Sequence, residues 1–550
     1  MGNLKESPGK RSRGRSRSPS RRAKSPSRAK KSPSRTGKSP NRASRSPNRS
    51  SRSPPRSTRT AKTLEAQTVE SAEAKQMIIS SRRKQSKSPT RQSQRVIERV
   101  ETTKLRATTR AATSASVSAS KQGDIVPAET IAFKGSSKGG RPYQFGGPLG
   151  VVILMILAPT ILLLLNLVCM KGSCRMKSLP PFPKSFAQYF DWQSVIIYTG
   201  WIFLQLFLTV VLPGRRLEGQ TLATGSRLSY KCNGFLCLLV SVLSLAVGHF
   251  LLKWPVLCIT KKLAPVILTA IVITFVASVI LYRSAANVEP ARLAPGGNTD
   301  SILYNFFVGR ELNPRVGALD IKVFALLRMG LISWVALNAI YLMRHYKDNG
   351  SIPLAPALIA AFQVFYVLDA LWFEETFLTT KATQNDGMGF LMMFGSLAWV
   401  PFYFSLPVRY MLLHHKGENN YYMLTSVCLL QVVGYVLYRG SNSQKNIFRR
   451  NPFDVRLAHM ETIPITSKRI LSSGWWGLCR HPNYLGDLLM ALAWSIPGGF
   501  SLLPISHLLF LIVMLVYRAK YDDADCLSKY GPSWERYCRR VRFRILPYIY

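Results

Sequence analysis

The feature that most constrains the fold is an apolar run from Leu149 to Met170 that contains no charged residue. A hydrocarbon core about 30 Å thick is crossed by roughly 20 helical residues, so this run can span a membrane. Further apolar spans follow near 194–212, 234–252, 264–282, 323–343, 353–372, 388–412, 421–438, 484–499 and 501–517. The backbone must satisfy its own hydrogen bonds in lipid. The sequence therefore predicts an all-α polytopic membrane protein with about ten transmembrane helices.

Basic residues are concentrated ahead of the first span. The chain has 74 Lys and Arg against 27 Asp and Glu, a net charge of +47, yet 47% of it is hydrophobic. Residues 1–148 hold 36 of the cations and 8 of the acids, and no Phe, Trp or Tyr occurs from Met1 to Thr130. Such a segment cannot bury enough apolar surface to offset the entropy lost on ordering. We predict a disordered basic tail over 1–148 and a membrane body over 149–550, not a cytosolic globular enzyme.

The distribution of charge also predicts the orientation of the body. Positive residues flanking the first span keep the tail on the cytoplasmic side, which for a nuclear membrane is the nucleoplasm. An even number of spans returns the C-terminal cluster Arg539, Arg540, Arg542 and Arg544 to the same side.

The tail contains a seven-residue repeat over residues 18–59. The unit Ser-Pro-x-Arg-x-x-Lys/Arg recurs six times, and its prolines forbid a continuous helix. Dense cations in a flexible chain neutralise phosphates and release counterions, which gives salt-dependent binding to nucleic acid. We interpret the tail as a tether to chromatin or DNA. The alternatives are RNA binding, splicing-type interactions of Arg-Ser segments, or nuclear import alone.

The repeat also predicts regulation by phosphorylation. Each unit places Pro at +1 and Arg at +3 from its serine, a pattern that proline-directed cell-cycle kinases favour. The candidate sites are Ser18, Ser25, Ser32, Ser39, Ser46, Ser53 and, beyond the repeats, Ser88. Six phosphates would remove about 9 to 12 units of charge, roughly half of the field of residues 1–60. The tether is therefore predicted to have an electrostatic release switch.

The cysteines predict neither a metal site nor a disulfide framework. The chain has nine, an odd number, and no two of them form a Cys-x-x-Cys pair. We expect reduced thiols in and around the membrane body, and we predict no metal site.

Polar and aromatic residues gather between the last spans and at the C-terminus, over residues 441–550. They include Lys445, Arg449, Trp475, Trp476, Arg480, His481, Asn483, Arg518, Asp522, Tyr530, Trp534 and Tyr537. Cations suit phosphates, flat aromatic rings suit a base, and amides and carboxylates suit hydroxyls or a carboxamide. This chemistry predicts a nucleotide pocket. The alternative is a set of interfacial aromatic anchors and lipid-facing basic residues.

Charged and polar groups inside the spans mark further candidates. Tyr366, Asp369, Glu374 and Glu375 lie at the end of the sixth span, and Arg328 lies within the fifth. Such groups are expensive in lipid and often functional, but they also pair between helices. For Arg328 we favour structural pairing.

Three segments carry a family resemblance. Residues 303–315 (LYNFFVGRELNPR), residues 474–487 (GWWGLCRHPNYLGD) and the Cys-x-x-Lys-Tyr-Gly-x-x-Trp-x-x-Tyr-Cys core at 526–538 resemble signatures of the sterol reductase family. The Arg-His-Pro-x-Tyr element also occurs in isoprenylcysteine methyltransferases, which use S-adenosylmethionine. The Leu-Asn-Pro-Arg signature argues against them.

The resemblance implies a ten-span body related to NADPH-dependent Δ14-sterol reductases. In that reaction the C14=C15 double bond is protonated and the nicotinamide hydride quenches the carbocation at C14. The positions that match cofactor contacts are Lys445, Arg449, Leu471, Trp476, Asn483, Arg518, Asp522, Tyr530 and Tyr537. If the chain is active, the proton donor is predicted to be Tyr366, polarised by Asp369.

Other positions depart from what the resemblance leads us to expect. Groups that could exchange a proton or carry charge are replaced at Asn305, Leu326, Phe373, Asn385, Ser396, Phe404, Tyr517, Ala519 and Tyr521. We expect most of them on the sterol side, outside the cofactor set. General acid–base catalysis is worth about 10²–10⁴-fold, so their loss predicts a body that binds NADPH but turns over poorly or not at all.

The basic tail on such a body resembles the branch of the family that serves as receptors at the inner nuclear membrane, continuous with the endoplasmic reticulum. The resemblance implies B-type lamin, chromatin, membrane lipid and a sterol as partners. A Tudor domain, which vertebrate members carry, is not expected because no aromatic residue precedes Phe133 to build its cage. The alternative is an active Δ14-sterol reductase whose tail only directs it to the nuclear envelope.

Overall fold

The computed structural model describes residues 143–169, 185, 189–221, 226–414, 420–465, 469–499 and 501–550. The basic tail, its repeats and its candidate phosphorylation sites lie outside the described residues. What the sequence predicts for them stays a prediction.

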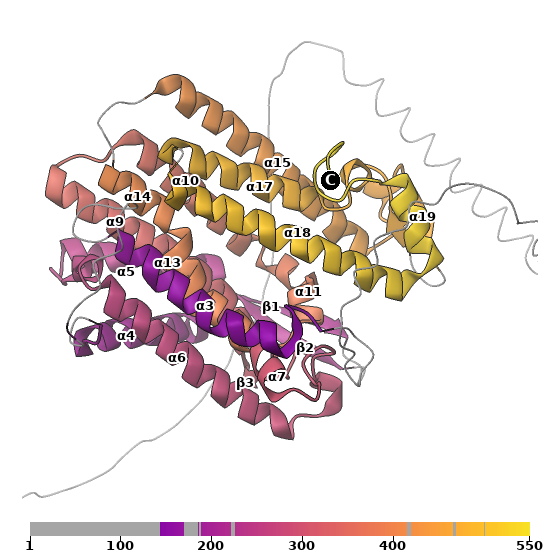
Figure 1. The fold of residues 1–550 in the computed structure, drawn as a ribbon, viewed down its shortest axis with the longest axis horizontal. Helices are drawn as coiled ribbons and strands as arrows, with labels where there is room; N and C mark the ends of the chain where they lie inside the picture. The colour runs from indigo at the N-terminus through magenta and orange to yellow at the C-terminus, as the bar shows by residue number, and fades with distance from the viewer. Residues whose placement is uncertain are drawn as a thin grey trace, which may run out of the picture. The chain divides into compact units, whose positions relative to one another are not determined.

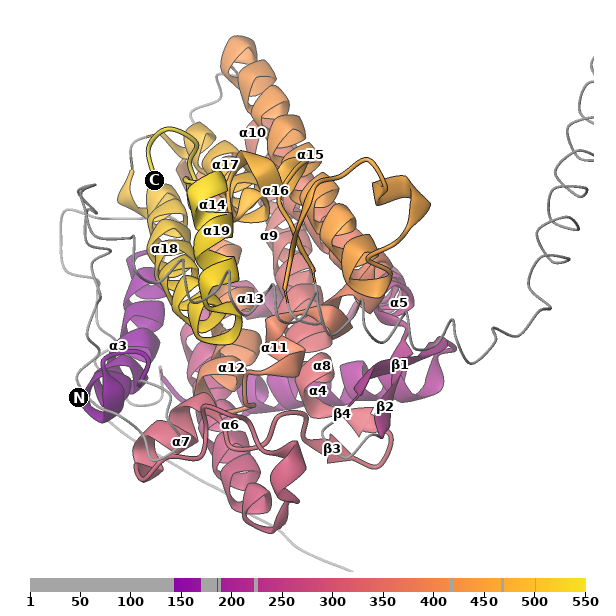
Figure 2. The ribbon, with the colours of Figure 1, turned by 90° about the vertical axis from the view of Figure 1, so that its right-hand side faces the viewer.

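Eight helices in the described ranges are long and apolar enough to cross a membrane. They are α3 (Gly147–Val168), α4 (Trp192–Val211), α6 (Leu263–Ser284) with η3 (Ala285–Asn287), the composite α8–η5–α9 (Ile321–Val323, Phe324–Ile332, Ser333–Asn349), α10 (Leu354–Trp372), the composite α12–η7–α13–α14 (Phe390–Phe394, Gly395–Trp399, Val400–Phe404, Leu406–His414), α15 (Tyr421–Arg450) and α18 (Leu502–Tyr530). Two shorter helices, α5 (Gly234–Phe250) and α17 (Pro482–Ser495), occupy the other predicted spans. The all-α polytopic class is confirmed (Figures 1 and 2).

Short elements fill the connections. The helical ones are η2 (Val256–Thr260), η4 (Pro290–Arg292), α7 (Ile302–Val308), η6 (Glu374–Thr379), α11 (Lys381–Gln384), η8 (Val455–Leu457), α16 (Trp475–Leu478), η9 (Ile496–Gly498) and α19 (Pro532–Arg540). The strands form three antiparallel pairs: β1 (Arg215–Thr221) with β2 (Arg227–Cys232), β3 (Arg315–Val316) with β4 (Leu319–Asp320), and β5 (Thr462–Pro464) with β6 (Arg469–Leu471). In the last pair Thr462 faces Leu471 and Pro464 faces Arg469.

Consecutive spans run in opposite directions, so alternate connections meet at one end of the bundle. The connections after α4, α6, α10 and α15 and the C-terminal segment lie at the end where α3 begins. At the opposite end Cys169 is disulfide-bonded, so the expectation of reduced thiols is wrong there. Disulfides persist in oxidising compartments. This bond supports a lumenal assignment for that end and agrees with the predicted orientation.

Arg328 and Glu374 form a buried ion pair between η5 and η6. Their side chains are 1% and 4% exposed, and Arg328 Nη1 lies 2.6 Å from Glu374 Oε1. Arg328 Nη2 donates to Asn233 Oδ1 at 3.0 Å, and the Gly234 amide donates to Glu374 Oε2 at 2.8 Å. A Cβ at Gly234 would lie 2.8 Å from Arg328 Nη1, so the pair requires glycine there. The structural pairing predicted for Arg328 is confirmed.

Residues 143–146, the tail root, fasten the start of the body to two distant elements. The Gln144 amide donates to the Tyr304 hydroxyl of α7 at 2.9 Å, and the Phe145 amide donates to the Tyr517 hydroxyl of α18 at 2.7 Å. The Phe145 ring stacks on Tyr517 with 5.3 Å between centroids. The root is therefore held by protein contacts ahead of α3.

Candidate cofactor site

The predicted cofactor residues come from elements at the end of the bundle where α3 begins. Lys445 and Arg449 lie on α15, Leu471 on β6, Trp476 on α16, Asn483 on α17, Arg518, Asp522 and Tyr530 on α18, and Tyr537 on α19. Helices α15, α17 and α18 pack side by side (Figure 1). Because about 20 residues cross the hydrocarbon, the last third of α15 and of α18 projects beyond it. The helices thus carry these residues out of the lipid to one place.

Trp476 forms a fixed aromatic wall of the site. Its side chain is buried with Leu471, and its Nε1 donates to the Ser441 carbonyl at 3.0 Å. The Tyr537 hydroxyl donates to the Trp476 carbonyl at 3.1 Å. Lys445 Nζ lies 3.6 Å from the centre of the indole ring, a cation–π contact. The Trp476 ring and the Lys445 ammonium are therefore positioned by contacts within the protein.

The first turn of α17 adds polar atoms that have no partner within the described part of the chain. Asn483 Oδ1 and His481 Nε2 are both buried and form no hydrogen bond. The imidazole stacks on Tyr484 with 4.7 Å between ring centres. Burial, together with the nearby Lys445 ammonium, lowers the pKa of His481 to about 3, while the Asp522 carboxylate opposes the shift. The neutral imidazole and the amide are therefore available to a ligand.

A layer of ion pairs ties α18 to the connection after α10. Lys381 Nζ lies 2.7 Å from Asp522 Oδ1 and 3.2 Å from Asp525 Oδ2, and Arg518 Nη2 lies 3.2 Å from Asp386 Oδ2. Burial would lower the pKa of Lys381, but the two carboxylates outweigh it and the pKa is raised. Sequence reasoning missed Lys381 and Asp386, because no motif or spacing connects this loop to the last helix.

Arg449, the second predicted cofactor cation on α15, is held by a backbone contact and takes no part in this layer of ion pairs. Arg449 Nη1 donates to the Thr379 carbonyl at 2.8 Å. In the described ranges neither Lys445 nor Arg449 forms an ion pair, whereas Asp522 also accepts a hydrogen bond from the Tyr484 hydroxyl at 3.2 Å. Two cations, an aromatic wall and orphaned amide and imidazole atoms fit the phosphates, rings and carboxamide of a dinucleotide.

The candidate proton donor has a different carboxylate neighbour from the one predicted. The Tyr366 hydroxyl lies 3.4 Å from Asp487 Oδ1. Asp369 is engaged elsewhere: Tyr435 Oη donates to it at 2.9 Å, and Arg439 lies 3.4 Å away. The predicted Tyr366–Asp369 partnership is therefore not formed. Asp369 is engaged by Tyr435 and Arg439 of α15, while the Tyr366 hydroxyl is directed at Asp487 of α17.

Asp487 is the last residue of the 474–487 segment, and the sequence predicts no role for it. It lies one helical turn after Asn483 on α17, which places the two on the same face. Around Tyr366 lie aromatic rings from three other elements: Trp334 at 6.2 Å, Tyr438 at 5.4 Å and Trp494 at 5.8 Å between centres. α17 thus connects the cofactor residues to this cluster of aromatic rings inside the bundle, called the aromatic chamber below.

Seven of the nine departing positions occupy two places, while Asn305 lies on α7 and Phe373 lies against Arg439. Tyr517, Ala519 and Tyr521 lie on α18 beside the ion-pair layer, with Lys381 Nζ 4.9 Å from the Tyr521 ring, and Asn385 adjoins Asp386. Leu326 and Ser396 lie in the π-helical segments η5 and η7, which pack on each other, and Phe404 lines the aromatic chamber. Several departures are therefore nearer the cofactor residues than the sequence indicated.

Fold and site together define a polytopic helical membrane protein with a cluster of cations, aromatic rings and polar atoms unpaired in the described residues, at one end of its last spans. Residues 133–550 match the Ergosterol biosynthesis ERG4/ERG24 family. The chain therefore belongs to the ERG4/ERG24 family, and the predicted sterol reductase relationship is confirmed.

Three relatives illustrate the match. The chain is 44% identical to Delta(14)-sterol reductase TM7SF2 of Mus musculus over 412 residues, which cover 74% of this chain and 98% of that protein. It is 39% identical to Delta(14)-sterol reductase LBR of Gallus gallus over 407 residues, 73% of this chain and 63% of that protein. It is 34% identical to Delta(14)-sterol reductase of Ascobolus immersus over 434 residues, 75% and 100% of the two chains.

Proposed function

We propose that this chain is an anchoring protein of the inner nuclear membrane whose sterol-reductase-type body binds NADPH with little or no turnover. Its basic tail binds chromatin and B-type lamin, and phosphorylation of the tail releases it. Lys445 and Arg449 hold the cofactor phosphates, Trp476 packs against its rings, and Asn483 takes its carboxamide. When bound, NADPH supplies a hydride.

The observation that carries loss of turnover is an orphaned histidine in the aromatic chamber. His507 is 1% exposed, and neither of its ring nitrogens has a hydrogen-bond partner within the described residues. The nearest ring is Phe404, 4.6 Å away edge to face, at a position where the resemblance leads us to expect tyrosine. A buried polar group without a partner costs about 1–3 kcal/mol. The arrangement is what remains when a polar network loses one hydroxyl.

A second position that departs from the family, Asn305, is also engaged in structural hydrogen bonds. Asn305 Oδ1 accepts from the Thr299 amide and hydroxyl, both at 2.8 Å, and Asn305 Nδ2 donates to the Thr299 carbonyl at 2.6 Å. This amide closes the turn before α7 and has no proton to exchange near neutral pH. Its role here is to hold the backbone.

The deciding experiment is complementation. The chain is expressed in cells that lack Δ14-sterol reductase, alongside the mouse relative as a positive control, and sterols are measured. We expect no rescue by this chain at matched expression, together with NADPH binding by the purified protein. Rescue equal to the control would overturn the proposed loss of turnover.

Anchoring is tested separately by deleting residues 1–60. The truncated protein should stay in the nuclear envelope membrane but lose salt-sensitive retention on chromatin and lamina. The deletion leaves the sequence of the membrane body, residues 149–550, unaltered. Unchanged retention would contradict the role of the tail.

The second candidate function is an active NADPH-dependent Δ14-sterol reductase. It is favoured by the contact between the Tyr366 hydroxyl and Asp487, 3.4 Å apart and one turn from Asn483. Tyr366 would then deliver the proton to the C14=C15 bond, with Asp487 holding its hydroxyl. If complementation succeeds, Tyr366→Phe should abolish it, and retained rescue would exclude this mechanism.

A further inference from the structure

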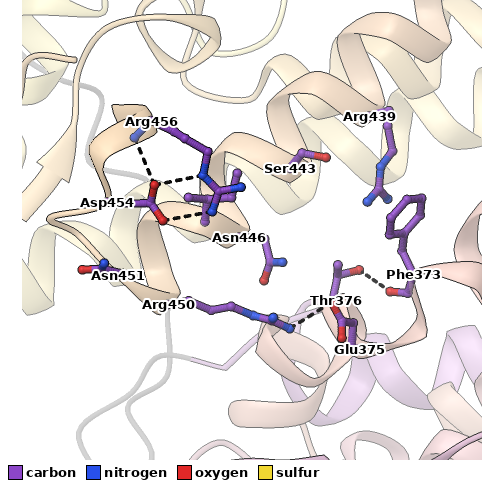
Figure 3. A pocket seen from close by; sticks show the side chains of 11 residues that line it. Phe373, Glu375, Thr376, Arg439, Ser443, Asn446, Arg450, Asn451, Asp454 and Arg456 are labelled. Carbon is purple, nitrogen blue, oxygen red and sulfur yellow. Dashed lines mark hydrogen bonds and ion pairs between the residues drawn. The ribbon is translucent and has the colours of Figure 1, made fainter. Parts of the chain in front are cut away.

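A cavity lies beside α15, on a different face from Lys445 and Arg449. It has a volume of about 320 Å³, and the residues that line it are Phe373, Glu375, Thr376, Arg439, Ser443, Asn446, Ile447, Arg450, Asn451, Asp454 and Arg456 (Figure 3). At 3.6 residues per turn, positions 439, 443, 446 and 450 share one face of α15, and Lys445 and Arg449 point about 90–130° away from its centre. The cavity is therefore separate from the cofactor site.

Three arginines and two acids line this cavity, and a third acid, Asp369, pairs with Arg439 just outside the lining, so that cations and acids are equal in number. Arg450 lies 3.2 Å from Glu375, Arg456 2.9 Å from Asp454, and Arg439 3.4 Å from Asp369. A guanidinium has five N–H donors, so one ion pair leaves donors for a phosphate group. Asn446 Oδ1 is buried without a hydrogen-bond partner in the described ranges. The cavity thus offers donors to an anion and an unused acceptor to an N–H or O–H group.

The depth of the cavity is fixed by the length of α15. The helix begins at Tyr421 and Tyr422, which are 67% and 91% exposed and mark the lumenal interface. Twenty residues at 1.5 Å each bring the chain about 30 Å further, to the vicinity of Arg439. Trp372, exposed at the end of α10, adjoins Phe373 at the same level. The cavity therefore opens at the headgroup layer of the cytoplasmic leaflet.

An apolar stripe leads up to the cavity from within the membrane. Leu429, Val432, Val433 and Val436 are exposed side chains of α15. Their spacing continues at three and four residues into Arg439, Ser443, Asn446 and Arg450, so stripe and cavity share one helix face. An acyl chain lying along the stripe would bring its headgroup to the arginines.

We propose that this cavity binds the phosphoethanolamine headgroup of a membrane glycerophospholipid. Its phosphate bridges Arg439 and Arg450, and its ammonium donates to Asn446 Oδ1 near the carboxylates of Glu375 and Asp454. The stripe carries one acyl chain. Glu375 and Thr376 of η6 line the cavity, and Thr379 of the same short helix accepts from Arg449, so the bound lipid adjoins the wall of the cofactor site.

The proposal is tested by lipid retention on the purified full-length protein. The protein is reconstituted in nanodiscs of equal phosphatidylethanolamine and phosphatidylcholine, extracted, and its bound lipids are quantified by native mass spectrometry. The two headgroups differ only in the N-methyl groups that remove every N–H donor. A charge-assisted hydrogen bond is worth about 1.5–3 kcal/mol, so wild type should prefer phosphatidylethanolamine about tenfold or more. Equal retention of the two lipids would overturn the proposal.

Two variants and a matched control locate the site. Arg450→Ala should lose most of the bound lipid, while Arg540→Ala, which removes an arginine of similar exposure also paired with a glutamate, should behave as wild type. Asn446→Leu should keep bound lipid but lose the preference between the two headgroups. Retention by Arg450→Ala equal to that by Arg540→Ala would place the lipid elsewhere.

Two further arms identify the source and class of the ligand. Soluble phosphoethanolamine should compete far more weakly than the lipid because it lacks the acyl chain on the stripe. Competition at equal concentration would contradict a lipid site. Preferential retention of phosphatidylinositol from a three-lipid nanodisc would overturn the ethanolamine assignment.

Discussion

Two groups of cations in this body differ in how their charge is balanced. Arg328 is buried and meets a carboxylate at 2.6 Å and an amide oxygen at 3.0 Å, all within the bundle. Lys445 is half-buried and meets an indole ring, and Arg449 is exposed and meets a carbonyl, with no ion pair to either in the described residues. A charge removed from water is costly unless it is paired. Arg328 therefore serves the fold, whereas the two cations of α15 keep contact with water and have donors left for an anionic ligand.

The largest expected effect is on the buried ion pair between Arg328 and Glu374. Glu374→Ala leaves Arg328 as an uncompensated buried charge and should lower the free energy of unfolding by about 3–5 kcal/mol. The thermal unfolding midpoint in detergent measures the loss. Arg328→Met combined with Glu374→Leu should recover most of the stability. If the Glu374→Ala protein were as stable as wild type, Arg328 would not depend on its ion pair. The contrast with Lys445 and Arg449 would then disappear.

The opposite is expected for Lys445, where a substitution should weaken ligand binding and leave stability nearly unchanged. Lys445→Met should weaken NADPH binding about 10- to 100-fold, because it removes a charge-assisted contact worth about 1.5–3 kcal/mol. The unfolding midpoint should change little, since Lys445 is only half-buried and has no ion pair to lose in the described residues. Titration of cofactor fluorescence and thermal unfolding of the same samples give both values. Loss of stability with unchanged binding would assign Lys445 to the fold.

The pH dependence of stability sharpens the comparison. His481 is neutral in the folded state, with a pKa of about 3, and its ordinary pKa is 6.5. Below pH 6.5 the unfolded chain binds a proton that the folded chain excludes, so stability falls on acidification. At pH 5 the loss should be about 2 kcal/mol, at about 1.36 kcal/mol per pH unit. His481→Gln should flatten the profile between pH 7 and 5, and an unchanged slope would exclude His481 as its source.

The smallest effect concerns the aromatic chamber. Phe404→Tyr should give the buried His507 a hydroxyl partner and raise the free energy of unfolding by about 1 kcal/mol. Phe404→Leu is the control that supplies no hydroxyl. If the tyrosine variant also gains measurable reductase activity, the missing hydroxyl is part of the lost network. If the two variants were equally stable, this would contradict the idea that His507 lacks a hydroxyl partner at position 404.

Hydropathy predicted the spans, and the motifs predicted residues that the structure brings together around Trp476. Continuous apolar runs report membrane crossing directly, and 474–487 and 526–538 fall on the elements that carry these residues. Partnerships across the fold were not predictable. Lys381 reaches Asp522 over 141 positions in sequence, and the Tyr366 hydroxyl contacts Asp487 while the nearby Asp369 is engaged by Tyr435 and Arg439. Strands of two or three residues, such as β3 and β5, leave no periodicity to detect.

The tail root has a mechanical consequence. If chromatin or lamina pulls on the tail, the load first meets the two backbone-to-tyrosine hydrogen bonds at Gln144 and Phe145, and only then α3. The bonds end on α7 and on α18 next to Arg518, so the force is shared between protein elements before it reaches lipid. The membrane helix is thereby shielded from being drawn out of the bilayer, and the nucleotide site is next to the point where the load arrives.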